Sequence, residues 1–431
     1  MANVSGGGVK GRRNWAWHRL VANYWSLPML AVLAAIPCAV AALAIDRDFF
    51  TQFLLGNDLS PVATSDTAKD LVGVAVGINA AFLTLYFSIS LLVLTVASSN
   101  LGVRLVDRWL DKRLVRVSLS GLCFTLVFSL AILGAIDAEA PLSRTPLGSI
   151  GAVIGFQAIN VLMLSVALHD LGRTIFVDRS IHYLGKEAAK PENELSSGTE
   201  FAGEWGQTIT APREGYVEGA DLPRLARMLR QHEGAIRVCC APGQHVLAGE
   251  PMLRLQYPYA DCEKLSDSVA IGDFRSDAQG VVFRVRLLVE IAARALSPAV
   301  NDFYTAIACA DRLAKAMEGQ ADRWVDDGLV AVWARDRRFE LPGQDFEGLF
   351  RDPLAALRQA ACDYPSVTLR LLDNIRKLVE RGRKAGQPAG LTAFLIGQAR
   401  AFAEHAADRA SFQGDRDDIM AGLSKVESAG S

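Results

Sequence analysis

The chain has 431 residues, of which 51% are hydrophobic, and its 45 basic and 47 acidic residues leave a formal net charge of −2. It is too long for one ordinary domain and too apolar on average for a soluble one. The near-neutral balance gives no argument for a nucleic-acid partner, so none is expected.

Apolar residues concentrate in four early runs, each long enough to cross a hydrocarbon core, which takes roughly 20 helical residues. No charged side chain lies in the middle of any run, although the third begins beside Arg116. Buried helices of a soluble enzyme are rarely so free of charge, so a membrane domain is favoured over a very apolar soluble bundle. The predicted spans are residues 27–45, 71–97, 115–136 and 147–168.

Positive charge gathers before the first span, between the second and third, and after the fourth, whereas the opposite connections are acidic or sparsely charged. The positive-inside rule then places the N-terminus and the C-terminal domain in the cytoplasm of a bacterial inner membrane. The first span lacks a small-residue cleavage site after it and is predicted to be retained. The basic residues are Lys10, Arg12, Arg13, Arg19, Arg104, Arg108, Lys112, Arg113, Arg173, Arg179 and Lys186.

Small and hydroxylated residues form a stripe on the second span, within roughly an 80° arc of a helix. Such a stripe favours close packing between helices, and it includes a G-x-x-x-G pair. The alternative is that it lines a narrow polar path. The stripe consists of Gly73, Gly77, Thr84, Ser88, Thr95 and Ser99.

Amide side chains also lie within the spans. Asn79 lies on another face of the second span, and Gln157 and Asn160 lie three residues apart on the fourth. An amide at that depth needs a partner inside the protein. Because no charged residue lies deep in a span, a relay of buried carboxylates is disfavoured, and a conduit lined by hydroxyls and amides stays open.

Beyond about residue 170 the composition becomes that of a soluble domain. Residues 171–206 are predicted to be a linker, and 207–280 two strand-like segments with a helical insert. The pattern "GYV…PGQHVLAGEPMLRL" resembles half of a barrel-sandwich module of the biotinyl and lipoyl or membrane-fusion adaptor type. The turn has no lysine for modification, so a plain small β-barrel without a cofactor is preferred.

Amphipathic spacing predicts several helices in a helical domain at 281–420, followed by a disordered tail at 421–431. The regions before the linker are a predicted cytoplasmic segment at 1–23 and a predicted domain of four transmembrane helices at 24–170. The fold class is an α-helical membrane domain plus a cytoplasmic α+β domain with a small barrel-sandwich-like β module and a helical C-terminal part.

The segment "RALSPAVND", residues 294–302, joins two predicted helices. Ser297 can cap a helix that begins at Pro298, and Asp302 can cap the next one. Alternatively, the hydrogen-bonding side chains crowded here bind a polar ligand or an ion, or couple this domain to a neighbour. Those side chains are Arg294, Ser297, Asn301, Asp302 and Thr305, of which the corner itself does not require Arg294 and Asn301.

No standard catalytic motif occurs in the sequence: there is no phosphate loop, no G-x-S-x-G elbow and no H-E-x-x-H helix. The seven cysteines include no C-x-x-C pair, so neither a disulfide framework nor a zinc site is expected. We therefore expect no enzymatic activity and no catalytic, cofactor-binding or metal-binding residues.

The stretch 275–313, "RSDAQGVVFRVRLLVEIAARALSPAVNDFYTAIACADRL", resembles the signature of the bacterial membrane proteins of domain of unknown function 2254. In that family an arginine and a hydroxyl residue open the helix, and an ALSP-x-x-ND corner closes it. Residues 87–105 similarly resemble its second span. The chain has Phe303 and Val103 where the family commonly has proline. The resemblance implies a multi-span inner-membrane protein whose biochemical role is not established.

Two functional hypotheses from different classes follow. The first is a homo-oligomeric channel or conduit for ions or small solutes, with a cytoplasmic regulatory domain. The second is a membrane-anchored sensor or scaffold that binds a ligand or protein partner through its cytoplasmic domain. The expected partners are the lipid bilayer and further copies of the chain.

Overall fold

The computed structural model describes residues 25–101, 113–174, 177–191 and 195–431. The chain divides into two compact units, Trp17–Phe176 and Val177–Ser431, apart from the N-terminal segment. Several basic residues on which the predicted orientation depends lie outside the described residues, namely Lys10, Arg12, Arg13, Arg19, Arg104, Arg108 and Lys112.

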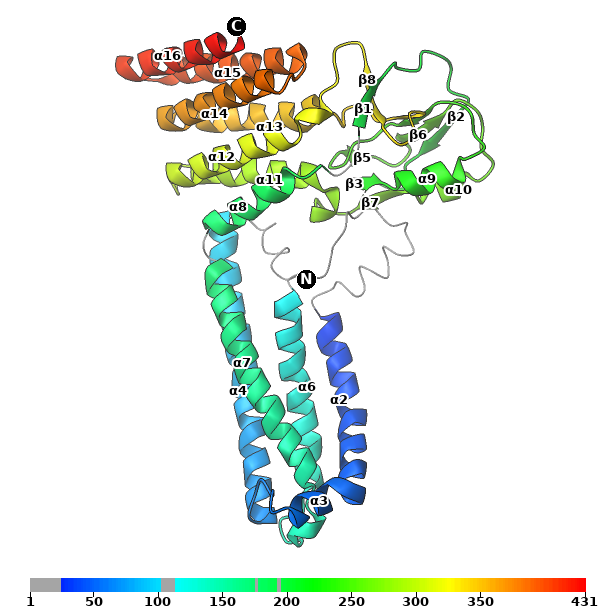
Figure 1. Ribbon diagram of the computed structural model, residues 1–431, viewed down its shortest axis with the longest axis vertical. Coiled ribbons are helices and arrows are strands. Elements are labelled where there is room, and N and C mark those ends of the chain that lie inside the picture. Colours follow the sequence, from blue (N-terminus) through cyan, green and yellow to red (C-terminus); the bar gives the residue numbers. More distant parts are fainter. Residues whose placement is uncertain (1–24, 102–112, 175–176, 192–194) are drawn as a thin grey trace. The chain divides into compact units, whose positions relative to one another are not determined.

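Four long helices lie side by side in the described part of the first unit (Figure 1). Each is long and apolar enough to cross a membrane, which confirms the four predicted spans. Helix α6 packs against the other three. The elements are α2 (Ser26–Ile45), η1 (Asp46–Phe50), α3 (Thr51–Gly56), α4 (Ser65–Leu101), α6 (Arg113–Ala135), η2 (Leu142–Arg144) and α7 (Leu147–Thr174).

The buried carboxylate of Asp46, the first residue after α2, caps the N-terminus of α7. Asp46 is 2% exposed and accepts the backbone N–H groups of Gly148 and Ser149 at 2.9 and 2.5 Å. These are among the first amides of α7, which have no partner within the helix. The hydroxyl of Thr51 lies 3.2 Å from this carboxylate and 3.0 Å from the carbonyl oxygen of Thr145. The network fastens η1 and α3 to the start of α7.

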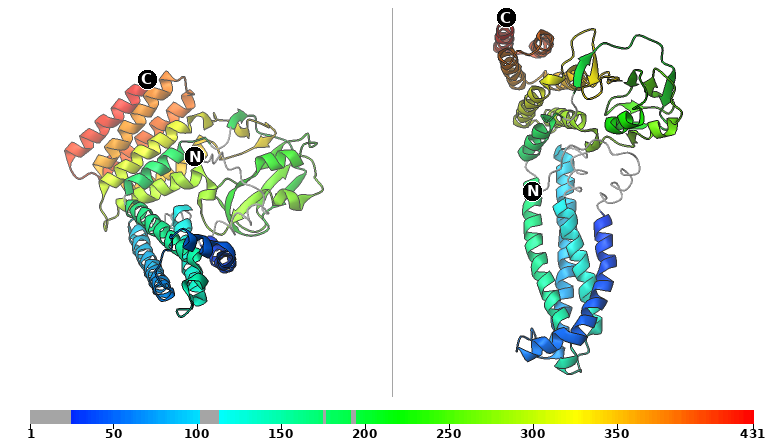
Figure 2. Two further views of the ribbon diagram at one scale, coloured as in Figure 1. Left: turned by 60° about the horizontal axis from the view of Figure 1, so that its bottom comes forward. Right: turned by 45° about the vertical axis from the view of Figure 1, so that its right-hand side comes forward.

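In the second unit the helices stack in two rows (Figure 2). Helices α12, α14 and α16 form one row and α11, α13 and α15 the other, and α8 packs against both α11 and α12. The helices are α8 (Val177–Ala188), α11 (Val281–Ala295), α12 (Phe303–Gly319), α13 (Phe346–Ala361), α14 (Pro365–Lys384), α15 (Ala389–Arg409) and α16 (Gln413–Gly430).

The strands of this unit form two open sheets. The larger has the order β1-β8-β9-β4-β6-β2 and is antiparallel except for the β4–β9 pair, and the smaller has the order β5-β3-β7. The short helix α9 (Leu222–Met228) is the predicted insert. The strands are β1 (Leu195–Gly198), β2 (Gln207–Thr210), β3 (Gly215–Ala220), β4 (Ile236–Val238), β5 (His245–Val246), β6 (Pro251–Leu255), β7 (Val269–Gly272), β8 (Val330–Trp333) and β9 (Phe339–Glu340).

Three predictions about the second unit differ from the structure. The predicted linker 171–206 contains α8 and β1, because α8 packs against α11 and α12 and β1 pairs with β8. The predicted helical domain 281–420 also contributes β8 and β9 to the larger sheet, and no closed barrel occurs among the described strands. The prediction of a disordered tail at 421–431 is wrong. This segment belongs to α16, and its residues Leu423 and Val426 are buried against neighbouring helices.

Candidate functional site

Three amide side chains lie inside the membrane unit, near the middle of their helices. Asn79 of α4 and Asn160 of α7 are 0% and 3% exposed, and Nδ2 of Asn160 donates to Oδ1 of Asn79 at 3.3 Å. Gln157 precedes Asn160 by three residues, on the same side of α7. The predicted internal partner is therefore confirmed for Asn79 and Asn160. We call Asn79, Gln157 and Asn160 the amide layer.

The amide layer separates two apolar clusters of the bundle. The first cluster includes Ala75 of α4 and Val153 of α7, and the second includes Tyr86 of α4 and Leu164 of α7. In both helices the amides lie between these positions. Packed side chains therefore close the amide layer on both sides along the bundle.

Part of the amide layer has no hydrogen-bond partner among the described residues. Nδ2 of Asn79 and both amide atoms of Gln157 are buried and unpaired. Gly121 of α6 faces the layer, because a Cβ at this position would lie 3.1 Å from Oδ1 of Asn160. Leaving a buried polar group unpaired costs about 1–3 kcal/mol, so such groups are expected to bind water or a polar ligand. The layer can donate and accept hydrogen bonds and carries no charge.

The hydroxyl groups of the predicted stripe face away from the chain's own helices. Thr84, Ser88 and Thr95 are exposed, and each donates to the backbone carbonyl four residues earlier at 2.8–2.9 Å. The side chain of Ser99 lies outside the described residues. Because these hydroxyls are satisfied by their own helix, the stripe is compatible with lipid as well as with a polar path, and its role stays a prediction.

The two glycine pairs, Gly73 and Gly77 of α4 and Gly151 and Gly155 of α7, likewise do not pack the helices of one chain together. A Cβ built on Gly73 or Gly77 would meet nothing within 4 Å outside its own helix backbone, and the same holds for Gly151 and Gly155. Each pair thus leaves a surface without side chains at which a helix of another copy could approach closely. Packing between copies of the chain stays a prediction.

The corner between α11 and α12 has the cap that the sequence predicts. Asp302 precedes α12, and its carboxylate accepts the backbone N–H of Thr305 at 3.1 Å and the Thr305 hydroxyl at 2.6 Å. Arg294 lies half-buried in the last turn of α11. Two of the five candidate side chains thus bind each other, and a ligand-binding role for the set stays a prediction.

The remaining part of the corner differs from the expectation. No helix begins at Pro298, because residues 298–300 form only a turn, in which the backbone carbonyl of Ser297 accepts the N–H groups of Val300 and Asn301. Asn301 is needed by this turn, since its φ of 49° is a left-handed conformation that asparagine tolerates better than most residues. Oδ1 of Asn301 also lies 3.3 Å from the Tyr364 hydroxyl.

Replacing Asn301 with valine is expected to lower the free energy of unfolding by about 1–2 kcal/mol, because a β-branched residue is strained at this φ. Glycine at the same position avoids the strain and should remain within about 0.5 kcal/mol of the wild type, apart from the lost contact with Tyr364. Thermal unfolding of the purified full-length protein checks both values. Equal destabilisation by the two variants would mean that the side-chain contact, and not the backbone, requires asparagine.

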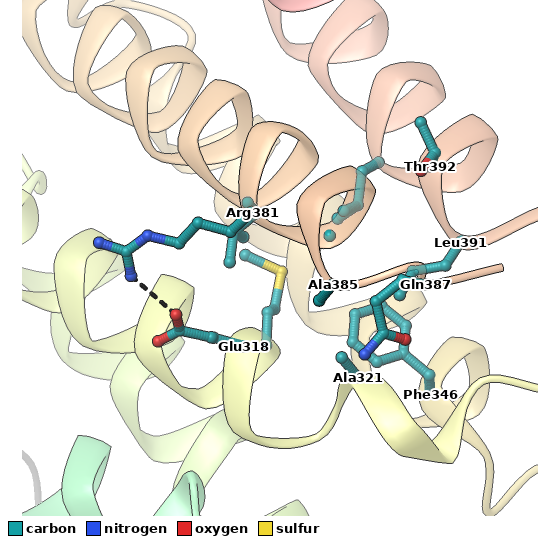
Figure 3. A pocket seen from close by; sticks show the side chains of 12 residues that line it. Glu318, Ala321, Phe346, Arg381, Ala385, Gln387, Leu391 and Thr392 are labelled. Atoms are coloured by element: carbon teal, nitrogen blue, oxygen red, sulfur yellow. Dashed lines mark hydrogen bonds and ion pairs between the residues drawn. The ribbon is translucent and has the colours of Figure 1, made fainter. Parts of the chain in front are cut away.

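A pocket of about 130 Å³ lies among the C-terminal helices (Figure 3). Met317 of α12, Phe346 of α13 and Leu391 of α15 are almost completely buried and supply apolar walls. On one side, Nη1 of Arg381 donates to Oε1 of Glu318 at 2.7 Å. The pocket therefore combines an apolar interior with an ion pair.

A charged groove of about 250 Å³ adjoins this pocket and shares Glu318, Leu378 and Arg381 with it. The second oxygen of Glu318 accepts Nζ of Lys315 at 2.7 Å. Hydrogen bonds from Lys315 and Arg381 lower the pKa of Glu318. Its carboxylate is therefore ionised at neutral pH and holds the two cations in place.

Sequence reasoning missed this pocket, because its walls come from four successive helices and the way these helices pack cannot be read from any one of them. The one available signal was that the apolar faces of the predicted later helices needed partners. Among the described residues, no group of three histidine, cysteine, aspartate or glutamate side chains is arranged to hold a metal ion.

Comparisons with known proteins identify the family of the chain. The family described as "Predicted membrane protein (DUF2254)" matches residues 22–377, a range that contains the four membrane helices and the α11–α12 corner. Uncharacterized proteins of Mycobacterium bovis and Mycobacterium tuberculosis are each 24% identical over 374 residues, which cover 81% of this chain and 72% of theirs. No solved structure matches the chain significantly. The chain therefore belongs to the DUF2254 family of predicted membrane proteins.

Proposed function

We propose that the protein is a conduit for small polar solutes and that these solutes pass through the amide layer. The observation that carries the proposal is the set of buried, unpaired amide atoms of Asn79 and Gln157 midway along the spans. Transport proteins hold their solutes near the middle of the membrane, between closures on either side. Because the layer carries no charge, neutral solutes that form hydrogen bonds fit it better than ions.

The simpler alternative is that the amides only hold the helices together. A hydrogen bond between membrane helices contributes about 0.6 kcal/mol on average, and the pair of Asn79 and Asn160 fits that role. Gln157 does not, because neither of its amide atoms has a partner among the described residues. The two interpretations predict different effects of replacing Gln157.

To test the conduit, we would reconstitute the full-length protein in liposomes and follow the entry of urea, formamide and glycerol by light scattering after an osmotic step. Asn79→Leu and Gln157→Leu are expected to reduce the protein-dependent entry by at least about tenfold, since they remove a polar layer from an apolar interior. Thr84→Leu is the matched control on the outer surface of the same helix and should change entry little.

Two outcomes would contradict the proposal. If liposomes with the wild-type protein take up these solutes no faster than protein-free liposomes, the protein does not transport them. Entry that survives both amide variants but is lost in Thr84→Leu and Ser88→Leu would move the path to the outer stripe, between copies of the chain. Conductance of potassium or chloride, measured in planar bilayers, would extend the proposal from neutral solutes to ions.

The proposal includes an arrangement of the chains. The outward glycines of α4 and α7 support association of copies within the membrane. The distribution of basic residues supports a bacterial inner membrane with the N-terminus and the unit Val177–Ser431 in the cytoplasm. Cross-linking in native membranes tests the association. With no catalytic motif in its sequence, we propose a role that is not enzymatic.

A second candidate function is a membrane-anchored sensor, and the pocket beside Arg381 favours it. The sequence hypothesis located ligand binding at the α11–α12 corner, whereas the pocket provides an apolar recess with charged groups beside it. If the protein does not make liposomes permeable but the unit Val177–Ser431 binds a specific ligand, the sensor is favoured over the conduit.

A further inference from the structure

We propose that the pocket and the adjoining groove bind a small amphiphilic carboxylate, with its apolar group in the pocket and its carboxylate in the groove. This inference deepens the sensor role above and rests on it, and it does not depend on transport through the amide layer. It is carried by the size of the pocket, the charge of the groove and the geometry of Arg381.

The volume of the pocket sets the size of the apolar group. A cavity of about 150 Å³ lined by aliphatic and aromatic side chains accommodates benzene, and this pocket has about 130 Å³ and walls that include Met317, Phe346 and Leu391. A straight or cyclic group of about six carbons is therefore the expected occupant. A full-length membrane lipid chain would not fit.

The charge beside the pocket favours an anion. Of the residues that line the groove, four are cationic and two are anionic, a surplus of two positive charges. Including Arg370, which pairs with Asp311, and Asp373, which pairs with Lys377, leaves the surplus unchanged. The lining charges are Arg312, Lys315, Lys377, Arg381, Asp311 and Glu318.

The carboxylates already present are committed to their own partners. Burial raises the pKa of Asp311, but hydrogen bonds from Arg370 and Asn374 outweigh it and hold the pKa below its ordinary value. Asp311 is thus a fixed counter-charge to Arg370 and does not neutralise the rest of the groove. Arg312 forms no ion pair with any residue that the structure describes, and its aliphatic stem is packed beside the position of Gly185.

Arg381 offers the hydrogen-bonding edge that a carboxylate needs. Glu318 uses Nη1 of its guanidinium, and no described residue bonds to the edge formed by Nε and Nη2. A carboxylate binds such an edge with two parallel hydrogen bonds. Because Arg381 lines both spaces, one ligand can reach this edge while its apolar part occupies the pocket.

The wall of the pocket at the end of α14 is held in place by its own hydrogen bonds. Gly386 has a φ of 70°, and the N–H of Gln387 donates to the carbonyl of Gly382 at 2.9 Å, as in a Schellman motif. A Cβ on Gly382 would meet only Gln387, at 3.7 Å. A Cβ is therefore tolerated at Gly382, and because this residue lines the pocket, a larger side chain here would occupy the pocket volume.

The test measures binding of hexanoate to the full-length protein in detergent by calorimetry and ligand-observed NMR. We expect a dissociation constant on the order of 1 mM or tighter, with 1-hexanol and hexylamine at least about tenfold weaker because the groove selects for negative charge. Arg381→Gln should weaken hexanoate binding at least about tenfold and Arg381→Lys less, since lysine keeps the charge but loses the two-bonded edge.

Gly382→Leu fills the pocket and should abolish binding while leaving the melting temperature unchanged. Arg409→Gln is the matched control, because Arg409 pairs with Asp363 at an exposed position and does not line the pocket. The inference is overturned if wild-type protein does not bind hexanoate, if 1-hexanol binds as tightly, or if stable Gly382→Leu protein binds as the wild type does. None of these outcomes bears on the transport assay.

Discussion

Replacing Glu340 with alanine is expected to lower the free energy of unfolding of the unit Val177–Ser431 by about 3 kcal/mol or more. Glu340 of β9 is 2% exposed, and its carboxylate accepts the Phe201 N–H at 2.5 Å and Nε of Arg237 at 2.7 Å. Alanine would remove the buried counter-charge of Arg237. It would also loosen the loop before β2, because the Trp205 ring stacks on that guanidinium at 5.1 Å.

Urea unfolding of the purified full-length protein, followed by tryptophan fluorescence, measures this loss. Asp363→Ala is the matched control, because its ion pair with Arg409 is more than half exposed on both sides and is worth less than about 1 kcal/mol. Glu200→Ala removes the exposed partner of Arg237 and should fall between the two. Stability of Glu340→Ala equal to that of Asp363→Ala would show that the buried ion pair does not hold the sheet to its loop.

Replacing Asp46 with alanine is expected to destabilise the membrane unit by about 2–4 kcal/mol, because the first amides of α7 would lose their buried acceptor. Gly148→Ala should have a similar effect by another route. A Cβ on Gly148 would lie 2.6 Å from Oδ1 of Asp46, so the carboxylate would have to move away. Asp46→Asn keeps one acceptor oxygen and should therefore destabilise the membrane unit less than Asp46→Ala does.

The measurement is the temperature at which detergent-solubilised protein ceases to elute as a single species in size-exclusion chromatography. Glu139→Ala is the control, since Glu139 is an exposed acid in the connection between α6 and α7 and its carboxylate does not reach α7 in the described structure. Unchanged thermal tolerance of both Asp46→Ala and Gly148→Ala would show that α7 does not depend on the cap.

Local patterns predicted the elements whose causes lie within a few residues. A membrane helix satisfies its own backbone and needs a continuous apolar surface, so hydropathy alone located α2, α4, α6 and α7. The Asp302 cap is equally local, because its partner Thr305 is three residues away. The left-handed turn at Asn301 was not predictable in this way, since it depends on how α11 and α12 are joined in space.

The two-residue strand β9 shows where local patterns fail. Phe339 and Glu340 carry no alternation long enough to detect, and they become a strand because β4 and β8 lie on either side. Helix α16 has a polar sequence, and packing against α14 and α15 keeps it folded. Contacts between distant segments supply the free energy in both cases, and a window of sequence does not contain them.

The sequence by itself determined that this is a membrane protein with four spans, its family, and the presence of amides at mid-membrane depth. Those properties depend on composition and on the spacing of residues along single helices. Only the tertiary structure decided that Asn160 bonds to Asn79 while Gln157 stays unpaired, and that Met317, Phe346 and Arg381 surround one pocket. Each of these sites exists only where several helices pack together, and the geometry of that packing is not encoded in any one of them.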